Sequence, residues 1–393
     1  MIKRTLQELC LNITDGKHGD CENEENSGYY FISCKDIFDG QINYKNARQI
    51  TKADFEETHK RTMLEVDDIL LTNSGTIGRM AFVTDRVATI KTTFQKSVAI
   101  IKPDKQKVLP RYLYYQLQNC VPQFINSSNG SAQKNLLLST MRTFQIEIEE
   151  NREKQEKIAN TLSAYDDLIE NNQKQIKLLE EAAQRLYKEW FVDLRFPGHE
   201  NTKIVDGVPE GWNEKTLSQV ADVIMGQSPK SEFYNSEKKG LPFHQGVGSY
   251  GVRFVMDDIY STSYTRIAEP NSILFSVRAP VGRLNITKNK VVIGRGLAAI
   301  NQTDGCQSYL YYLLKNKFFK DNIVGNGSIF ASVSKDELLN QKFLIPERNL
   351  MMQFEKIVSQ MDKQIENLDS KNKKLIEARD RLLPKLMSGE VEV

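Results

Sequence analysis

An eight-residue string occurs twice in this chain and constrains the fold more than any other feature. "YLYYQLQN" at 112–119 returns as "YLYYLLKN" at 309–316, with six of the eight residues identical. Such a repeat predicts one folded unit written twice along the chain. The chain has 393 residues, a length sufficient for two or three domains.

Neighbouring segments extend the repeat over the whole chain. "ILLTNSGTIGR" (69–79) matches "ILFSVRAPVGR" (273–283), and both predict a buried strand, a polar turn and a Gly-Arg pair entering the next strand. "FQIEIEE" (144–150) parallels "FLIPERN" (343–349). We therefore expect an α+β fold with a pseudo-two-fold internal repeat, in which two similar globular domains combine mixed β-sheets with helices.

A long charged stretch with heptad spacing follows each copy. Apolar positions recur at intervals of four and three from Ile158 to Trp190, and again from Phe354 to Leu386. This spacing is typical of a coiled coil. The predicted order is a first globular domain at 1–150, a first long spacer helix at 151–195, a second globular domain at 196–348 with a linker at 196–212, and a second long spacer helix at 349–393.

The two heptad stretches predict an antiparallel register. If Asn172 faces Asn372, the residue numbers in every layer sum to 544, and each apolar position meets an apolar partner. A buried asparagine pair fixes register while lowering stability. The one charged core position, Arg379, then faces Tyr165, where we expect a cation–π contact.

Composition gives no sign of an enzyme or a membrane protein. Lys and Arg number 53 and Asp and Glu 51, so the charge does not by itself indicate a nucleic-acid partner. No apolar run reaches the ~20 residues of a membrane helix, and five scattered cysteines without C-x-x-C spacing fit the reducing cytoplasm and no metal site. The sequence has no G-x-x-x-x-G-K-[ST] phosphate loop and no catalytic constellation, so we expect a binding or assembly protein without a cofactor of its own.

The polar loops of both copies are rich in residues that bind nucleic acid. Arg and Lys pair with guanine, Asn and Gln pair with adenine, Ser and Thr suit phosphates, and aromatic rings stack on bases. A solvated turn is the alternative for each loop, but recurrence in both copies favours DNA binding. The candidate contacts are Lys17, Ser74, Thr76, Arg79, Phe94, Gln95, Lys96, Ser131 and Gln133 in the first domain, and Gln227, Ser228, Lys230, Tyr234, Gln245, Arg278, Arg283, Arg295 and Ser328 in the second.

Four segments resemble one protein family. "GQSPKSEFYN…GLPFHQG" (226–246) and "GSAQKNL" (130–136) resemble the opening and closing segments of target-recognition domains, and "LYKEWFVDLRFPGHE" (186–200) with "VPEGW" (208–212) resembles their junction. The whole chain resembles the specificity (S) subunit of a type I restriction–modification system. The first domain departs from the pattern, because it lacks a "PEGW"-like lead and the "PF-x-QG" signal.

The resemblance implies a non-catalytic subunit that reads a divided DNA sequence. Each target-recognition domain would read one half of double-stranded DNA, and the helices would set the spacer between the halves. Two methylation (M) subunits carrying S-adenosylmethionine would dock on the helices and flip an adenine out of each half-site. Restriction (R) subunits, which use ATP and Mg²⁺, would join through the M subunits. The Asn-Pro-Pro-aromatic tetrad of adenine methyltransferases is absent from this sequence.

Two alternatives remain open from the sequence. A coiled-coil scaffold that ignores DNA would explain the heptads but not the repeated polar loops. A restriction enzyme or methyltransferase with its own active site would need a cofactor loop or metal-binding carboxylates, and neither pattern is found.

Overall fold

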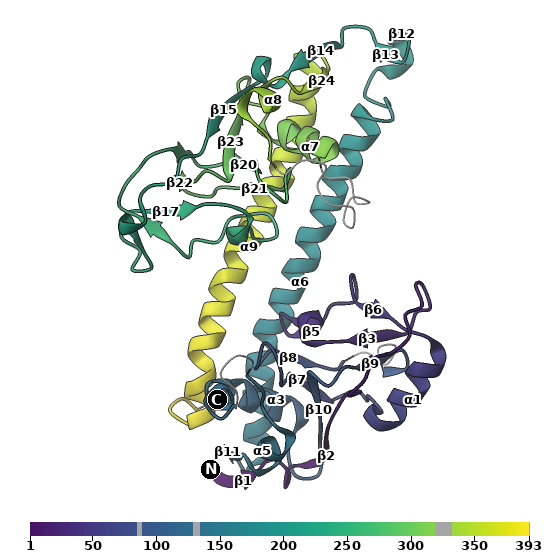
Figure 1. Ribbon diagram of the computed structural model, residues 1–393, viewed down its shortest axis with the longest axis vertical. Coiled ribbons are helices and arrows are strands. Elements are labelled where there is room, and N and C mark those ends of the chain that lie inside the picture. The colour runs from purple at the N-terminus through teal and green to yellow at the C-terminus, as the bar shows by residue number, and fades with distance from the viewer. Residues whose placement is uncertain (85–88, 129–133, 319–331, 393) are drawn as a thin grey trace. The chain divides into compact units, whose positions relative to one another are not determined.

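A computed structural model describes residues 1–84, 89–128, 134–318 and 332–392, in which the chain forms two compact units (Figure 1). The first unit consists of Met1–Asn172 and Lys371–Val393, and the second of Gln173–Ser370. The two long helices α6 (Arg152–Phe191) and α9 (Arg348–Ser388) each contribute residues to both units. The domain boundaries predicted above stay predictions, since this division follows contacts within the chain and not function.

The first unit is built on a four-stranded antiparallel sheet in the order β2-β10-β7-β8. A second sheet, β6-β3-β9, and the pairs β1-β11 and β4-β5 complete its strands. The elements are β1 (Ile2–Thr5), β2 (Cys10–Asp15), β3 (Tyr30–Ile32), β4 (Ile37–Phe38), β5 (Gln41–Ile42), β6 (Arg48–Gln49), α1 (Lys52–Thr62), β7 (Ile69–Thr72), β8 (Met80–Phe82), β9 (Thr92–Phe94), β10 (Val98–Pro103), α3 (Pro110–Asn119), α4 (Val121–Asn126), α5 (Leu138–Thr143) and β11 (Gln145–Ile148).

The second unit repeats this plan with the sheet β15-β23-β20-β21. Its second sheet, β16-β18-β17-β22-β19, is larger, and β14 pairs with β24 as β1 pairs with β11. The elements are β12 (Ile204–Val205), β13 (Val208–Pro209), β14 (Asn213–Thr216), β15 (Ala221–Met225), β16 (Tyr234–Asn235), β17 (Leu241–His244), β18 (Tyr260–Ser261), β19 (Ile267–Ala268), β20 (Ile273–Ser276), β21 (Leu284–Ile286), β22 (Val291–Ile293), β23 (Leu297–Gln302), α7 (Gln307–Phe318), α8 (Lys335–Leu339) and β24 (Lys342–Ile345).

The strand registers of the two four-stranded sheets agree, apart from a shift between Lys102 and Pro103 of β10. Val98 of β10 lies opposite Thr72 of β7, as Leu297 of β23 lies opposite Ser276 of β20. The match of 69–79 with 273–283 therefore extends to hydrogen-bonded partners, and the predicted duplication of an α+β domain is confirmed.

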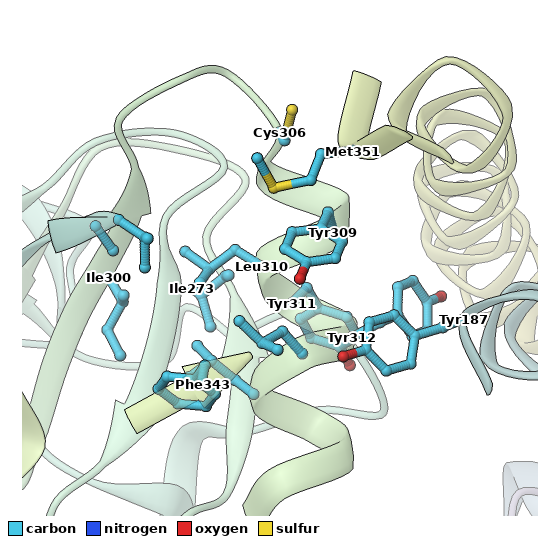
Figure 2. Close-up of a cluster of buried hydrophobic side chains, with 14 of the residues drawn as sticks. Tyr187, Ile273, Ile300, Cys306, Tyr309, Leu310, Tyr311, Tyr312, Phe343 and Met351 are labelled. Atoms are coloured by element: carbon cyan, nitrogen blue, oxygen red, sulfur yellow. The ribbon is translucent and has the colours of Figure 1, made fainter. Parts of the chain in front are cut away.

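The repeated string forms the helix that fills the core of each unit. Pro110 occupies the first turn of α3, where its missing N–H costs no hydrogen bond. In the second unit, Tyr309 and Tyr312 of α7 lie beside Tyr187 of α6, with ring centroids 6.0 and 6.4 Å from it (Figure 2). The aromatic residues of α7 therefore pack this helix against the long helix α6.

The long helices run antiparallel within each unit. In the first unit, Nδ2 of Asn172 donates a hydrogen bond to Oδ1 of Asn372 at 2.7 Å. In the second, the rings of Trp190 and Phe354 lie 6.0 Å apart. Both pairs belong to the register in which residue numbers sum to 544, so the structure contains the asparagine contact that the heptads predicted.

Arg379 differs from the expectation. Its guanidinium binds the carboxylates of Asp166, at 2.6 Å, and Asp380, at 2.8 Å. The ring of Tyr165 is not among its partners within the described residues. A carboxylate one residue away from the predicted partner provides a full charge, which a half-buried guanidinium prefers to the face of a ring.

Candidate nucleic-acid interface

In the second unit, four loops are joined by backbone hydrogen bonds into what we call the second loop cluster (226–228, 244–246, 277–278 and 293–296). The amide of Gln227 donates to the carbonyl of Ile293 at 2.9 Å. The amide of Gly296 donates to the carbonyl of Gln245 at 3.1 Å, and that of Val277 to Gly296 at 2.9 Å. The loops of the cluster are therefore held together mainly by main-chain hydrogen bonds.

Glycines bring these loops into contact. A Cβ on Gly226 would lie 2.1 Å from the carbonyl oxygen of Gly294, and one on Gly296 would lie 2.3 Å from that of Gln245. Only glycine fits such an approach of two backbones. The "GQSP" and "GRG" segments of the sequence are thus explained by packing between loops.

The cluster presents long polar side chains to solvent. Those of Gln227, Gln245, Arg278 and Arg295 are exposed. The guanidinium groups of Arg278 and Arg295 form no hydrogen bond or ion pair with any residue in the described part of the chain. Ser228 is half-buried, and its Oγ accepts a hydrogen bond from the amide of Arg295 at 3.2 Å.

The first unit has an equivalent first loop cluster (16–17, 32–33, 73–74 and 94–97). The amide of Lys17 donates to the carbonyl of Phe94 at 2.8 Å, and that of Asn73 to Ser97 at 3.0 Å. A Cβ on Gly16 would lie 1.9 Å from the carbonyl oxygen of Phe94. The two hydrogen bonds correspond to those of Gln227 and Val277, and Gly16 corresponds to Gly226, so this part of the backbone scaffold occurs twice.

Two arginines also occupy matched turns. The amide of Arg79 donates to Oγ1 of Thr72 at 2.9 Å, and the amide of Arg283 donates to Oγ of Ser276 at 2.8 Å. Arg79 is exposed and Arg283 half-buried. Threonine and serine both supply the hydroxyl, which explains why the two segments align in sequence.

Phe94 requires a correction. Its side chain is fully buried, because the three-residue strand β9 pairs in parallel with β3 inside a core cluster. The interpretation of Phe94 as a ring that stacks on bases is therefore wrong.

Lys17 is occupied by an internal ion pair. Its Nζ lies 2.9 Å from Oδ1 of Asp54 and 3.2 Å from Oε2 of Glu57, both on α1. The hydrogen bond to Asp54 is the main cause that raises the pKa of Lys17. Lys17 would have to leave this pair to bind a phosphate.

The other candidates of the first unit lie on its loops. Lys96 and Thr76 are exposed, and Ser74 is half-buried and bridges to Asn135. Gln95 is half-buried and accepts a hydrogen bond from Ser97 Oγ at 3.3 Å. Ser131 and Gln133, with Ser328 of the second unit, lie outside the described residues.

Two candidates of the second unit lie on the segment before β17. Tyr234 stacks on Phe243 with ring centroids 4.7 Å apart, and its hydroxyl donates to the carbonyl of Pro229 at 2.9 Å. Lys230 is exposed, 3.9 Å from the carboxylate of Glu232. Tyr234 thus supports the loop from within, whereas Lys230 can reach solvent.

Arg253 was missed by the sequence analysis. Its side chain is 2% exposed and binds Glu180 of α6 at 3.4 Å and Asp362 of α9. It also donates to the hydroxyl of Tyr312 at 3.1 Å and lies 4.5 Å from the ring centroid of Tyr311. The sequence around Arg253 does not indicate this role, because its carboxylate partners are distant in sequence.

The charges around Arg253 stabilise one another. Burial alone would lower the pKa of Arg253, but the tyrosines and carboxylates around it raise that pKa above the usual value. Burial raises the pKa of Asp362, while the positive charge of Arg253 opposes that shift. The guanidinium therefore stays charged and favours an ionised Asp362.

Among residues 1–84, 89–128, 134–318 and 332–392, no group of three His, Cys, Asp or Glu side chains converges on a possible metal ion. Likewise, none of the helices in this part of the chain combines the length and apolarity that a membrane crossing requires.

A family model and several known proteins are similar to this chain over most of its length. The family model of the type I restriction modification DNA specificity domain matches residues 3–181 and 209–378. The putative type I restriction enzyme MjaX specificity subunit of Methanocaldococcus jannaschii is 27% identical, over 99% of this chain and 93% of that protein. The MjaIX specificity subunit of the same organism is 28% identical, over 92% of this chain and 87% of that protein.

A solved structure shares the fold. The crystal structure of a type I restriction-modification S subunit from M. genitalium superposes with a TM-score of 0.59 at 17% sequence identity. The match covers 98% of this chain and 95% of the other.

Proposed function

This chain belongs to the family of the type I restriction modification DNA specificity domain, and from that premise we propose that its two units each read one half of a divided DNA target. The chain is a specificity subunit of a type I restriction–modification system, which is a non-catalytic component. Its work on DNA would be in the cytoplasm.

The observation that carries this proposal is the repeated loop cluster. In both units, matched backbone hydrogen bonds hold the loops, such as Lys17 to Phe94 and Gln227 to Ile293. The side chains at matched positions differ, as Lys17 differs from Gln227. A constant scaffold with variable exposed polar groups suits two domains that read different sequences on the same kind of ligand.

We further propose the partners of the complex. Two M subunits carrying S-adenosylmethionine dock on the long helices, and R subunits, with ATP and Mg²⁺, join through them. The helix register, with Asn172 opposite Asn372, sets the length of the unread DNA between the half-sites. This chain contributes recognition, and the bound partners supply methyl transfer and cleavage.

An exchange of one domain tests whether each unit reads only one half of the DNA target. The complete system is expressed in cells, and the methylated sequence is determined by methylome sequencing. Replacing residues 1–150 with the corresponding domain of another specificity subunit should change one half of the methylated sequence. A change of both halves together would contradict the two-domain proposal.

The candidate residues of the second unit provide a finer test. We propose that Arg278, Gln245 and Lys230 contact DNA, because all three side chains are exposed. Losing a base contact costs about 1–3 kcal/mol and relaxes one base position. Unchanged DNA binding by Arg278→Ala at low and at moderate salt would remove Arg278 from the interface.

A further inference from the structure

The matched hydrogen bonds of the two loop clusters establish which side chains correspond between the units. The bond from Asn73 to Ser97 corresponds to that from Val277 to Gly296, so the following residues, Ser74 and Arg278, share one position. Their backbones pair in the same way, Ser74 with Asn135 and Arg278 with Ser332. These matches depend on structure and need no sequence similarity in the loops.

A second position carries a cation in both units. Lys96 directly precedes Ser97, which accepts the bond from Asn73, and Arg295 directly precedes Gly296, which accepts the bond from Val277. The amide of Lys96 donates to the carbonyl of Lys17 at 3.0 Å, and that of Arg295 donates to Ser228 Oγ at 3.2 Å. Both side chains are exposed.

DNA offers two kinds of contact to such a pair of domains. The phosphate backbone is the same in both half-sites, whereas the base edges differ. A residue type that both units keep at one position therefore suits the phosphate backbone. A residue type that only one unit has suits a base found in one half-site.

We propose that Lys96 and Arg295 contact phosphate in their respective half-sites, and that Arg278 reads a guanine in the second half-site only. Arg278 has the planar pair of donors that matches O6 and N7 of guanine, and Ser74 lacks it. Its guanidinium has no hydrogen-bonding or ion-pair partner in the described part of the chain, so binding a base breaks no internal contact. This inference rests on the proposed function and assigns roles within it.

The first test replaces Arg278 in the full chain, expressed with its methylation partners. Arg278→Ser installs the residue of the first unit, and Arg278→Lys keeps the charge without the fork of donors. Both should reduce discrimination by roughly 5- to 150-fold at one G·C pair of the second half-site. Arg4→Ser, which removes an exposed arginine of β1 outside both loop clusters, is the control and should leave the methylated sequence unchanged.

The second test removes the shared cations. Arg295→Gln and Lys96→Gln should each weaken DNA binding evenly across sequences and reduce the slope of log affinity against log salt by about 0.9. Arg295→Lys and Lys96→Arg, which keep the charge, should restore the slope. Thermal unfolding of each variant shows whether the fold is retained.

Several results would overturn the assignment. Arg278→Lys with unchanged base preference would make Arg278 a phosphate contact, and an altered base preference in Arg295→Gln would make Arg295 a base-reading residue. A wild-type complex that methylates no divided sequence would instead contradict the proposed function itself.

Discussion

Each unit has a partly buried aspartate at the same position of a long helix, and the two units supply its cationic partner from different parts of the chain. Asp166 of α6 and Asp362 of α9 are each the fifteenth residue of their helix. Asp166 receives the hydroxyl of Tyr115 at 2.6 Å and the guanidinium of Arg379, which belongs to the opposite helix. Asp362 receives the guanidinium of Arg253 instead, which comes from the globular domain.

The helix position that corresponds to Arg379 explains the difference. In the second unit it is Ala183, which is fully buried and brings no charge. The first unit thus stabilises its carboxylate within the helices and the repeated helix, while the second depends on a residue between β17 and β18. We infer that an exchanged first domain must bring a tyrosine at the position of Tyr115, whereas an exchanged second domain must also bring an arginine at the position of Arg253.

Among the variants considered, the removal of Arg253 should cause the largest loss of folding stability. Arg253→Ala leaves Glu180 and Asp362 without their cation, and breaking a buried pair costs about 3–5 kcal/mol. The loss should appear as a lower midpoint in chemical or thermal unfolding of the full chain. Arg381→Ala in the first unit is the control, since the side chain of Arg381 is 78% exposed and its ion pair with Glu377 is worth under about 1 kcal/mol.

The effect of Arg253→Ala should grow with pH. Without the cation, burial leaves the folded-state pKa of Asp362 above its unfolded value, so the folded variant binds more protons. Its stability therefore falls as pH rises from the unfolded pKa of about 4 through the raised folded value. A destabilisation that is equal at pH 5 and pH 8 would mean that Asp362 does not depend on Arg253.

Tyr115 and Tyr312 hold the same place in the repeated string and have opposite hydrogen-bonding roles. The hydroxyl of Tyr115 donates to Asp166, whereas that of Tyr312 accepts from Arg253. Tyr115→Phe should cost about 1.5–3 kcal/mol of folding stability, as for a hydrogen bond to a charged group. Tyr312→Phe should cost less, because Arg253 keeps both carboxylates. Urea unfolding compares the two, and a larger loss for Tyr312→Phe would reverse the comparison.

The duplicated domain and the helix register were predictable because they depend on patterns that a sequence carries locally. Heptad spacing aligned Asn172 with Asn372, and the repeat aligned Thr72 with Ser276. The burial of Phe94 was not predictable, since a strand of three residues between Lys91 and Gln95 is too short to show periodicity. Arg253 was missed because its partners lie 73 and 109 residues away, and only the folded chain brings them together.

The asparagine pair of the first unit tests the helix register. Asn372→Leu leaves the amide of Asn172 unpaired and should cost about 1–3 kcal/mol, measured by thermal unfolding. The double variant Asn172→Leu with Asn372→Leu should recover that loss, because no unpaired amide remains.

Crosslinking then locates the contact directly. In a chain whose five native cysteines are replaced, Asn172→Cys with Asn372→Cys should form a disulfide within one molecule. Efficient crosslinking of position 172 to 379 instead would show a shifted register.

The smallest expected effect on DNA affinity comes from Glu57 of α1, which pairs with Lys17 in the first loop cluster. The matched residue of the second unit, Gln227, is uncharged. Glu57 lies 3.2 Å from Lys17 and its side chain is 71% exposed, so Glu57→Gln should remove one of the two carboxylates that hold Lys17, while Asp54 stays, without disturbing the core. We expect affinity for DNA carrying the first half-site to rise roughly twofold to fivefold at low salt, the scale of one exposed ion pair. The slope of log affinity against log salt should become steeper by up to about 0.9 if Lys17 then contacts a phosphate.

Glu56→Gln is the matched control: it removes the same charge from the same helix, but Glu56 pairs with Lys52. Equal gains from both variants would show a general effect of net charge, and a gain from Glu57→Gln alone would show that this ion pair holds Lys17 away from DNA.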